Sequence, residues 1–242
     1  YQPIVDFKSG YTYKAEALIR WNHPTLGLIP PDRFIPVAEE TGAITEIGEW
    51  VFQQAANQVA KWRSKHNSEF QISINKSPVQ FTNREDGHDA WINHLQELHL
   101  PGDSLAIEIT ENLLLDVKSN INDKLLKFRN AGFQVSIDDF GTGYSSLSYL
   151  QKLDIDYLKI DQSFIRNLQE DSSELVLCIA IITMAHNLGL RVIAEGVETE
   201  TQRDLLISMG CDYGQGYLFS KPIPAEEFDA SFCLTEKSKK MK

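Results

Sequence analysis

Cysteine is scarce in this 242-residue chain, with only Cys178, Cys211 and Cys233, far apart in the sequence. Three scattered thiols exclude a disulfide framework and a thiolate zinc site, and they favour a reducing, cytoplasmic setting. Basic residues are outnumbered, and the net charge of −11 argues against binding of long nucleic acid through a basic surface. No apolar run approaches the roughly 18 residues of a membrane span, and no secretory signal opens the chain. We expect a cytoplasmic domain that makes no membrane contact, so that any membrane anchor belongs to another part of a longer protein.

An initiator methionine is also lacking, and residues 2–7 already have the pattern of a strand. We therefore expect the chain to be excised from a longer, multidomain protein. Residues 236–242 are charged and have no apolar periodicity. We expect one domain over residues 1–232, followed by a charged tail over residues 233–242.

Short apolar segments alternate with helical patterns along the chain. The expected strands are 2–7, 14–20, 71–75, 105–109, 134–138, 157–160, 192–194 and 216–219. Apolar stripes at helical spacing, including Trp50 with Trp62 and Leu175 with Ile179, predict helices between them. Alternation of strands and helices predicts an α/β protein with a parallel sheet, and eight strands are enough for a TIM-like (β/α)8 barrel. Residues 8–13 are too short for a crossover helix, so we expect the first two strands to form a hairpin and one barrel strand to be antiparallel.

Polar residues end most of the expected strands. In chain order they are Glu16, Asn75, Glu108, Asp138 with Asp139, Lys159 with Asp161, Glu195, and Gln215. Any one of them alone is more readily explained as a turn former or a helix cap. Together they indicate a site, because the carboxyl ends of barrel strands converge on one mouth. Several carboxylates there would repel one another without a cation, and oxygen ligands that include one amide suit Mg²⁺ or Mn²⁺.

The adjacent pair Asp138-Asp139 is the strongest local signal. One carboxylate can bridge two metal ions while its neighbour binds one, an arrangement that suits in-line displacement at phosphorus. The glycine-rich segment that follows, residues 140–146, leaves the expected ligands directly. Such a segment could gate the site, although it is explained equally well as a turn into a helix.

These residues resemble a known family. Glu16-Ala17-Leu18 is similar to the signature of the EAL domains, the cyclic di-GMP phosphodiesterases. Further blocks follow in the family's order, namely Tyr1-Gln2-Pro3-Ile4, Phe34-Ile35-Pro36, Asn75-Lys76-Ser77, Glu108-Ile109-Thr110-Glu111, Asp138-Asp139-Phe140-Gly141-Thr142-Gly143, Lys159-Ile160-Asp161, Glu195-Gly196-Val197-Glu198 and Gln215-Gly216-Tyr217. The resemblance extends from Tyr1 to about Phe228.

The resemblance implies hydrolysis of cyclic di-GMP to linear pGpG by a water that two Mg²⁺ or Mn²⁺ ions activate, in bacterial second-messenger signalling. It implies Glu16, Asn75, Glu108 and Asp138 as ligands of one ion, and Asp138 and Asp139 as ligands of the other. Lys159, Glu195 and Asp139 match catalytic positions, with Lys159 orienting or deprotonating the water. Positions that contact or support the substrate are matched by Gln2, Arg20, Asp161, Glu198, Gln215 and Tyr217. Glu111 matches the anchor of the loop after Asp139.

Family likeness also implies a homodimer, fused to sensory or diguanylate-cyclase-like domains in the full-length protein. Two other functions are compatible with parts of the pattern. A binding module could sense cyclic di-GMP without turnover, but the ligand set and the lysine are complete here. A Schiff-base aldolase could use Lys159 on a similar barrel, but the carboxylates around it favour a metal site.

Overall fold

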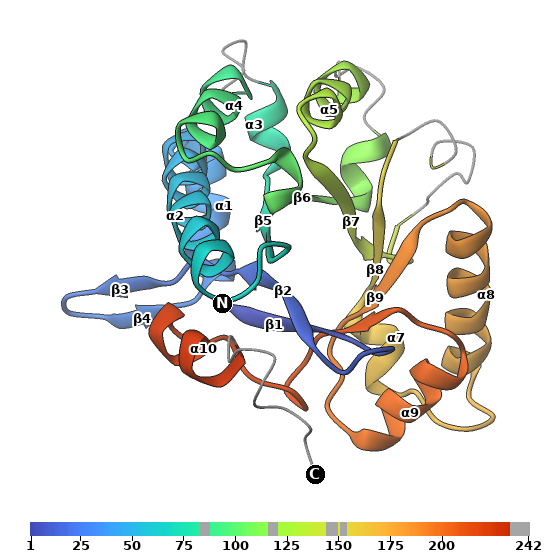
Figure 1. Cartoon of the computed structure of the whole chain (residues 1–242). Coiled ribbons are helices and arrows are strands. Elements are labelled where there is room, and N and C mark those ends of the chain that lie inside the picture. Colours follow the sequence, from blue (N-terminus) through green and yellow to red (C-terminus); the bar gives the residue numbers. More distant parts are fainter. Residues whose placement is uncertain (83–87, 116–120, 144–149, 151–153, 233–242) are drawn as a thin grey trace.

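The chain folds as a barrel of strands surrounded by helices (Figure 1). The computed structural model describes residues 1–82, 88–115, 121–143, 150 and 154–232. Its strands are β1 (Gln2–Asp6), β2 (Thr12–Ala17), β3 (Trp21–His23), β4 (Gly27–Ile29), β5 (Gln71–Asn75), β6 (Leu105–Thr110), β7 (Gln134–Phe140), β8 (Tyr157–Ile160), β9 (Arg191–Ala194) and β10 (Tyr213–Gly214). Its helices are α1 (Pro31–Thr41), α2 (Ile44–Lys65), α3 (Pro78–Thr82), α4 (His88–Glu97), α5 (Ile121–Asn130), α7 (Gln162–Arg166), α8 (Ser173–Asn187), α9 (Glu200–Ser208) and α10 (Ala225–Phe232), with 3-10 turns η1 (Gly102–Ser104) and η2 (Glu111–Leu115).

Eight of these strands close into one barrel, in the order β1-β10-β9-β8-β7-β6-β5-β2. The pairs from β2 through β5 and round to β10 are parallel. Only β1 departs from this direction, because it is antiparallel to both neighbours, β2 and β10. The expected (β/α)8 TIM-like barrel with one antiparallel strand is confirmed.

The antiparallel strand β1 begins beside the end of β2. Gln2 of β1 is the register partner of Glu16, the second-last residue of β2. The turn between the two strands is tight, with Asp6 N donating to Tyr11 O at 2.9 Å. The amino group of Tyr1 donates to the carbonyl of Ile223 at 2.7 Å, which ties the start of β1 to the segment before α10. The chain therefore enters the barrel next to Glu16.

The main apolar core lies between the sheet and the helices, on the outward face of the strands. Leu105, Ile107 and Ile109 of β6 point outward and are almost fully buried. Phe52 and Val59 of α2 belong to the same cluster. Burial of these faces holds the strands in place and leaves their other face for the barrel interior.

The barrel interior is largely polar. Its small apolar cluster consists of Ile4, Tyr157, Ile193 and Tyr213. Each of these residues is two positions from a polar residue on the same strand face, as Tyr157 is from Lys159. The interior cluster therefore separates two polar layers, one at each end of the barrel.

The polar layer at the end of the barrel away from Lys159 is centred on Lys14, which is two residues before Glu16 on β2. Its ammonium donates to Gln71 and, at 2.7 Å, to the hydroxyl of Tyr157. Burial, together with the charge of Arg191, lowers the pKa of Lys14 to about 7. This lysine has polar but uncharged hydrogen-bond partners among the contacts described, unlike Lys159 at the other end.

One expected strand is wrong. The last barrel strand is Tyr213–Gly214, whereas residues 216–219, expected to form it, make a turn in which Phe219 N donates to Gly216 O at 3.1 Å. Leu218 N donates to the carbonyl of Val197 at 3.0 Å. The backbone of this turn is therefore bonded to the loop after β9 and not to a barrel strand.

Two expected helix stripes are partly wrong. Trp50 on α2 is 54% exposed and Ile179 on α8 is 45% exposed, whereas Trp62 is buried as expected. Trp50 is three residues from Ile47 and one from Val51, so it lies on the edge of the stripe, beyond the surface that the sheet covers. A wide apolar stripe does not tell which of its edges will be buried.

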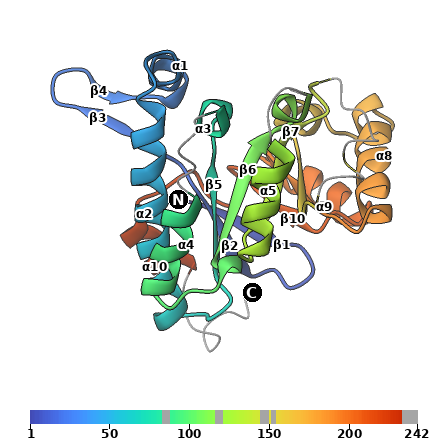
Figure 2. The same ribbon diagram turned by 90° about the horizontal axis from the view of Figure 1, so that it is seen from above.

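The hairpin of β3 and β4 was not expected. It projects beside α1, away from the barrel (Figure 2). Trp21 anchors its base by edge-to-face packing on Phe34, with ring centroids 5.7 Å apart. Across the described ranges, no helix has the length and apolar character needed to span a membrane.

Candidate metal and catalytic centre

Successive strands deliver the predicted site residues to one end of the barrel. Asn75 at the end of β5 is the direct register partner of Glu108 on β6. Asp138 on β7 is paired with Thr110, two residues beyond Glu108 on the same face of β6. Parallel register and alternation of side chains therefore bring these groups together, as the strand-end pattern predicted.

Lys159 lies at the centre of the group. Its ammonium is 2.6 Å from Glu195 Oε1, 2.7 Å from Glu108 Oε2, 3.1 Å from Asp138 Oδ1 and 3.5 Å from Glu16 Oε2. The lysine side chain is 1% exposed. Four carboxylates thus surround one buried positive charge.

The charges perturb one another strongly. Burial alone would lower the pKa of Lys159, but the four carboxylates outweigh it and raise that pKa well above its ordinary value. Burial would raise the pKa of Glu16, but Lys159 and the amides of Gln215 and Asn75 lower it. Burial raises the pKa of Glu108 well above its ordinary value, and nearby Glu16 and Asp138 add to the effect. Lys159 therefore does not compensate the whole negative charge of the cluster.

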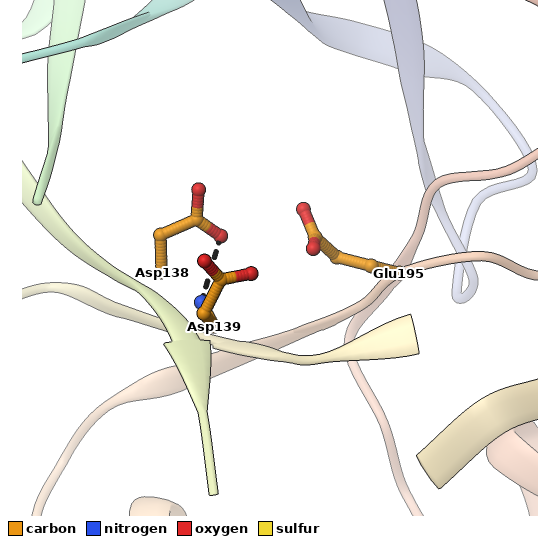
Figure 3. A group of neighbouring side chains, drawn as sticks. All are labelled: Asp138, Asp139 and Glu195. Carbon is orange, nitrogen blue, oxygen red and sulfur yellow. Dashed lines mark hydrogen bonds between the residues drawn. The ribbon is translucent and has the colours of Figure 1, made fainter. Parts of the chain in front are cut away.

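Asp138, Asp139 and Glu195 form the open side of the cluster, and Figure 3 shows their carboxylates turned toward one another. One ligand oxygen from each lies within 4.8 Å of the others. Burial, with the charge of Asp138, raises the pKa of Glu195 to about 8 and that of Asp139 to about 6. Asp139 has a left-handed backbone, φ 54°, and its N–H donates to Asp138 Oδ1 at 3.0 Å. This backbone turn aims both adjacent carboxylates at the same space.

The donor set fits divalent cations that prefer oxygen. Glu108 Oε1 is buried and has no hydrogen-bond partner among the described residues. Asn75 donates its Nδ2 to Glu16 Oε1 at 2.6 Å, which leaves the amide oxygen for another contact. The ammonium of Lys159 shows that a positive charge is already accommodated where the carboxylates meet. Carboxylate and amide oxygens without thiols or clustered imidazoles suit Mg²⁺ or Mn²⁺.

Glu111 binds the backbone of the loop after Asp139, and its role as the anchor of this loop stays a prediction. Glu111 is 1% exposed, and its Oε2 accepts hydrogen bonds from Gly141 N at 2.7 Å and Gly143 N at 3.4 Å. Gly141 has φ 100°, and a Cβ there would meet the ring of Phe164 at 2.7 Å. Phe164 was not identified as a site residue, although it closely follows the Lys159-Ile160-Asp161 block. The last residues of the glycine-rich segment, 144–146, lie outside the described part.

Removal of this anchor gives a first test. Glu111→Ala should lower metal affinity and turnover by about 10–100-fold each, because the loop would no longer hold Asp139 in place. Calorimetric titration with the metal would measure its affinity, steady-state kinetics would measure turnover, and thermal unfolding would measure stability. Ser172→Ala is the control, since Ser172 caps α8 away from the site and its loss should cost about 1 kcal/mol of stability alone. A Glu111→Ala protein that loses stability but keeps its turnover and metal affinity would reject the anchor role.

Residues assigned to the substrate fall into three groups. Arg20, Glu198 and Tyr217 are exposed, and each follows a strand end that carries a site residue. Asp161 is buried and caps α7 by accepting from Ser163 N at 2.9 Å, and its charge contributes to the raised pKa of Asp139. Gln2 and Gln215 are buried and bonded to each other. The first group borders the mouth, Asp161 interacts with Asp139, and the two glutamines lie behind Glu16.

A closed barrel with an acidic cluster and a central lysine at its strand ends defines a class of barrel proteins with a polar site at one mouth. Residues 1–222 match one family of this class, the EAL domain. The chain belongs to this family. It is 41% identical over 231 residues to a bifunctional diguanylate cyclase/cyclic di-GMP phosphodiesterase, MucR, of Pseudomonas aeruginosa, a match that covers 96% of this chain and 34% of MucR. It is 40% identical to the oxygen sensor protein DosP of Escherichia coli, covering 94% of this chain and 28% of DosP. The chain thus spans about a third of the length of these two relatives.

Solved structures agree with this assignment. The PaMucR phosphodiesterase in complex with c-di-GMP superimposes with a TM-score of 0.87 at 40% identity, covering 94% of this chain and 92% of that one. An EAL domain protein from Listeria monocytogenes superimposes with a TM-score of 0.82 at 34% identity, covering 96% and 90%. The family assignment therefore rests on the fold as well as on the sequence.

Proposed function

We propose that this chain hydrolyses cyclic di-GMP to linear pGpG, with Mg²⁺ or Mn²⁺ as cofactor. The observation that carries the proposal is the buried ammonium of Lys159 in contact with four carboxylates at the barrel mouth. Its support from relatives is that MucR is a cyclic di-GMP phosphodiesterase and that the similar PaMucR structure holds c-di-GMP.

In this proposal Glu16, Asn75, Glu108 and Asp138 hold one cation, and Asp138 with Asp139 holds a second. When bound, the cations supply Lewis-acid polarisation of the phosphodiester and favour ionisation of water. The rest of the chemistry belongs to the chain. Glu195, at 2.6 Å, orients the ammonium of Lys159. Bound cations would neutralise the carboxylates around Lys159, and these carboxylates would then raise the pKa of the lysine less. Its buried amine would become able to accept a proton from the attacking water.

The exposed residues at the mouth supply contacts for the nucleotide. Arg20 offers a guanidinium for a phosphate, and Glu198 offers a carboxylate for donors on a base. The ring of Tyr217 is 57% exposed, with the ammonium of Lys221 5.3 Å from its centroid. An exposed ring of this kind suits stacking of a base.

We further propose residues 1–232 as the domain, which includes α10 beyond the family match. The charged tail at 233–242 lies outside the described residues. By analogy with its longer relatives, the domain would be fused to sensory or diguanylate-cyclase-like domains, act in the cytoplasm and pair as a homodimer. Sedimentation of the isolated chain would test the pairing.

The direct test is incubation with cyclic di-GMP and separation of the products. We expect pGpG to form with Mg²⁺ or Mn²⁺, and no product after exhaustive chelation. Calcium should support little or no turnover, since its longer and looser coordination misplaces the reacting groups. Binding of cyclic di-GMP without any product under all these conditions would favour a sensing module, and full activity in chelator would exclude the metal mechanism.

A further inference from the structure

The short helix α7 begins between two segments of the barrel mouth. Ile160, the last residue of β8, is the register partner of Phe140 and accepts a hydrogen bond from Glu195 N at 3.1 Å. Because α7 follows β8 almost directly, it starts between the segment that carries Asp139 and the segment that carries Glu195.

The first contact of α7 is with the loop after Asp139. The ring of Phe164 lies so close to Gly141 that a Cβ on this glycine would be 2.7 Å from Cε2 and 2.8 Å from Cζ of the ring. Glu111 binds the same loop through the N–H groups of Gly141 and Gly143. A carboxylate and an aromatic ring thus both contact the residues that follow Asp139.

The second contact of α7 is with the segment after Glu195. Gly196 has φ 69°, and a Cβ there would be 2.6 Å from the Cβ and 3.3 Å from the Cα of Gln162. These two atoms belong to the helix itself, so they cannot move aside as the end of a long side chain can. The glycine therefore lets α7 pack one residue away from Glu195.

The helix is also fixed at its far end. Ile165 is fully buried in the main apolar core. The buried side chain of Gln202 donates its Nε2 to the carbonyl of Ile165 at 2.9 Å, and its Oε1 accepts from Glu198 N at 2.8 Å and Thr199 N at 3.0 Å. Gln202 thus ties the end of α7 to the segment that follows Glu195.

We propose that α7 is a spacer that sets the separation of Asp139 from Glu195, and that Phe164 is the positioning residue through which it holds the loop after Asp139. The two carboxylates face the same space (Figure 3), with one oxygen of each within 4.8 Å of the other. The inference rests on the proposed function only in taking Asp139 as a metal ligand and Glu195 as the partner of Lys159. Loss of a group that supports a ligand costs about 10–100-fold in metal affinity.

The first test is metal binding without substrate, followed by kinetics, on the whole chain. Phe164→Ala should raise the Mn²⁺ dissociation constant by about tenfold in calorimetry and lower kcat by about 10–100-fold, with KM for cyclic di-GMP changed by no more than about twofold. Phe164→Leu, which keeps part of the apolar bulk, should show smaller losses and serves if Phe164→Ala does not fold. Phe232→Ala is the matched control, since Phe232 is also partly buried but packs on Phe228 within α10. It should lower stability and leave metal affinity unchanged.

The second test concerns the contact of α7 with the segment after Glu195. Gly196 and Gly189 both have left-handed backbones, with φ of 69° and 80°, so alanine strains the backbone at either position. Only at Gly196 would the new Cβ meet α7, since no described atom lies within 4 Å of the place that a Cβ would take at Gly189. We expect Gly196→Ala to lower kcat by about tenfold or more at saturating Mn²⁺, and Gly189→Ala to leave kcat unchanged.

A double variant shows whether the two contacts act through the same helix. Without the ring of Phe164, α7 can move toward the loop and make room for the new Cβ. The loss of kcat in Phe164→Ala combined with Gly196→Ala should therefore be smaller than the product of the two single losses.

Four results would overturn the proposal. They are unchanged metal affinity and kcat in Phe164→Ala, raised KM with unchanged metal affinity in that variant, equal kcat in the two glycine variants, and losses that multiply in the double variant. If the unsubstituted chain binds Mn²⁺ but yields no pGpG, the proposed activity fails while the metal titrations of Phe164→Ala still decide this inference. Absence of Mn²⁺ binding would overturn both.

Discussion

Lys159→Met should give a protein that is stable only when divalent cations are present. Without Lys159, buried Glu108 and Glu16 lose their countercharge, and loss of one partner from a buried ion pair costs about 3–5 kcal/mol. Mg²⁺ or Mn²⁺ should restore most of this stability by neutralising the same carboxylates. Turnover should stay about 10²–10⁴-fold lower even when the metal sites are saturated, because the proton acceptor is gone. Urea unfolding with and without Mn²⁺, together with kinetics at saturating Mn²⁺, measures both effects.

The barrel contains its own control for this experiment. Lys14 is a second buried lysine on the inner face of the barrel, and its hydrogen bonds go to Gln71 and the hydroxyl of Tyr157. Lys14→Met should leave turnover unchanged and should not make stability depend on metal. If Lys159→Met shows the same stability in chelator and in Mn²⁺, the ammonium is not the countercharge of the site. Unimpaired turnover would remove its catalytic role.

Asp138→Asn should have opposite effects on activity and on stability. The substitution keeps the shape of the side chain but removes a carboxylate that would serve both cations. We expect turnover to fall by at least about 10³-fold, more than the 10–100-fold typical of supporting residues. The metal-free protein should unfold at the same or a higher urea concentration, because the carboxylates around Lys159 carry more charge than the lysine compensates.

The comparison for this variant is Asp154→Asn, which removes an exposed carboxylate 2.8 Å from Arg129. That change should cost between about 0 and 1 kcal/mol and leave turnover unchanged. Calorimetry with Mn²⁺ should show weaker binding for Asp138→Asn alone. A marked loss of stability in metal-free Asp138→Asn would mean that Asp138 holds the fold together, and lost turnover could then not be assigned to metal binding.

The sequence was sufficient to predict the barrel and the residues at its mouth. Side chains alternate along a strand and parallel strands end at one edge, so Asn75, Glu108 and Asp138 could be placed together from their positions alone. The short connection after β1 likewise predicted the antiparallel strand, because no crossover helix fits in it. These predictions needed only local pattern and chain connectivity.

What could not be predicted depends on contacts between distant segments. The stretch at 216–219 has a strand-like composition, but Leu218 bonds to the carbonyl of Val197 and forms a turn. Gln2 and Gln215 were recognised as important, but their side chains meet across 213 positions of sequence. The periodicity of the sequence does not indicate that the side chain of Gln215 turns toward Glu16 and not toward the mouth.

The direction of β1 decides where a pull on the amino terminus is felt. In a barrel of parallel strands alone, tension at the amino terminus enters at the end opposite the strand carboxyl ends and must travel the length of a strand to reach them. Here, tension at the Tyr1 nitrogen passes through one peptide unit to Gln2, which faces Glu16 across the sheet. Displacements of about 1 Å at reacting groups can change rates by roughly 100-fold. A force applied before β1 would therefore reach the proposed metal site over a single peptide unit. We expect such a force to lower turnover without any contact with the nucleotide.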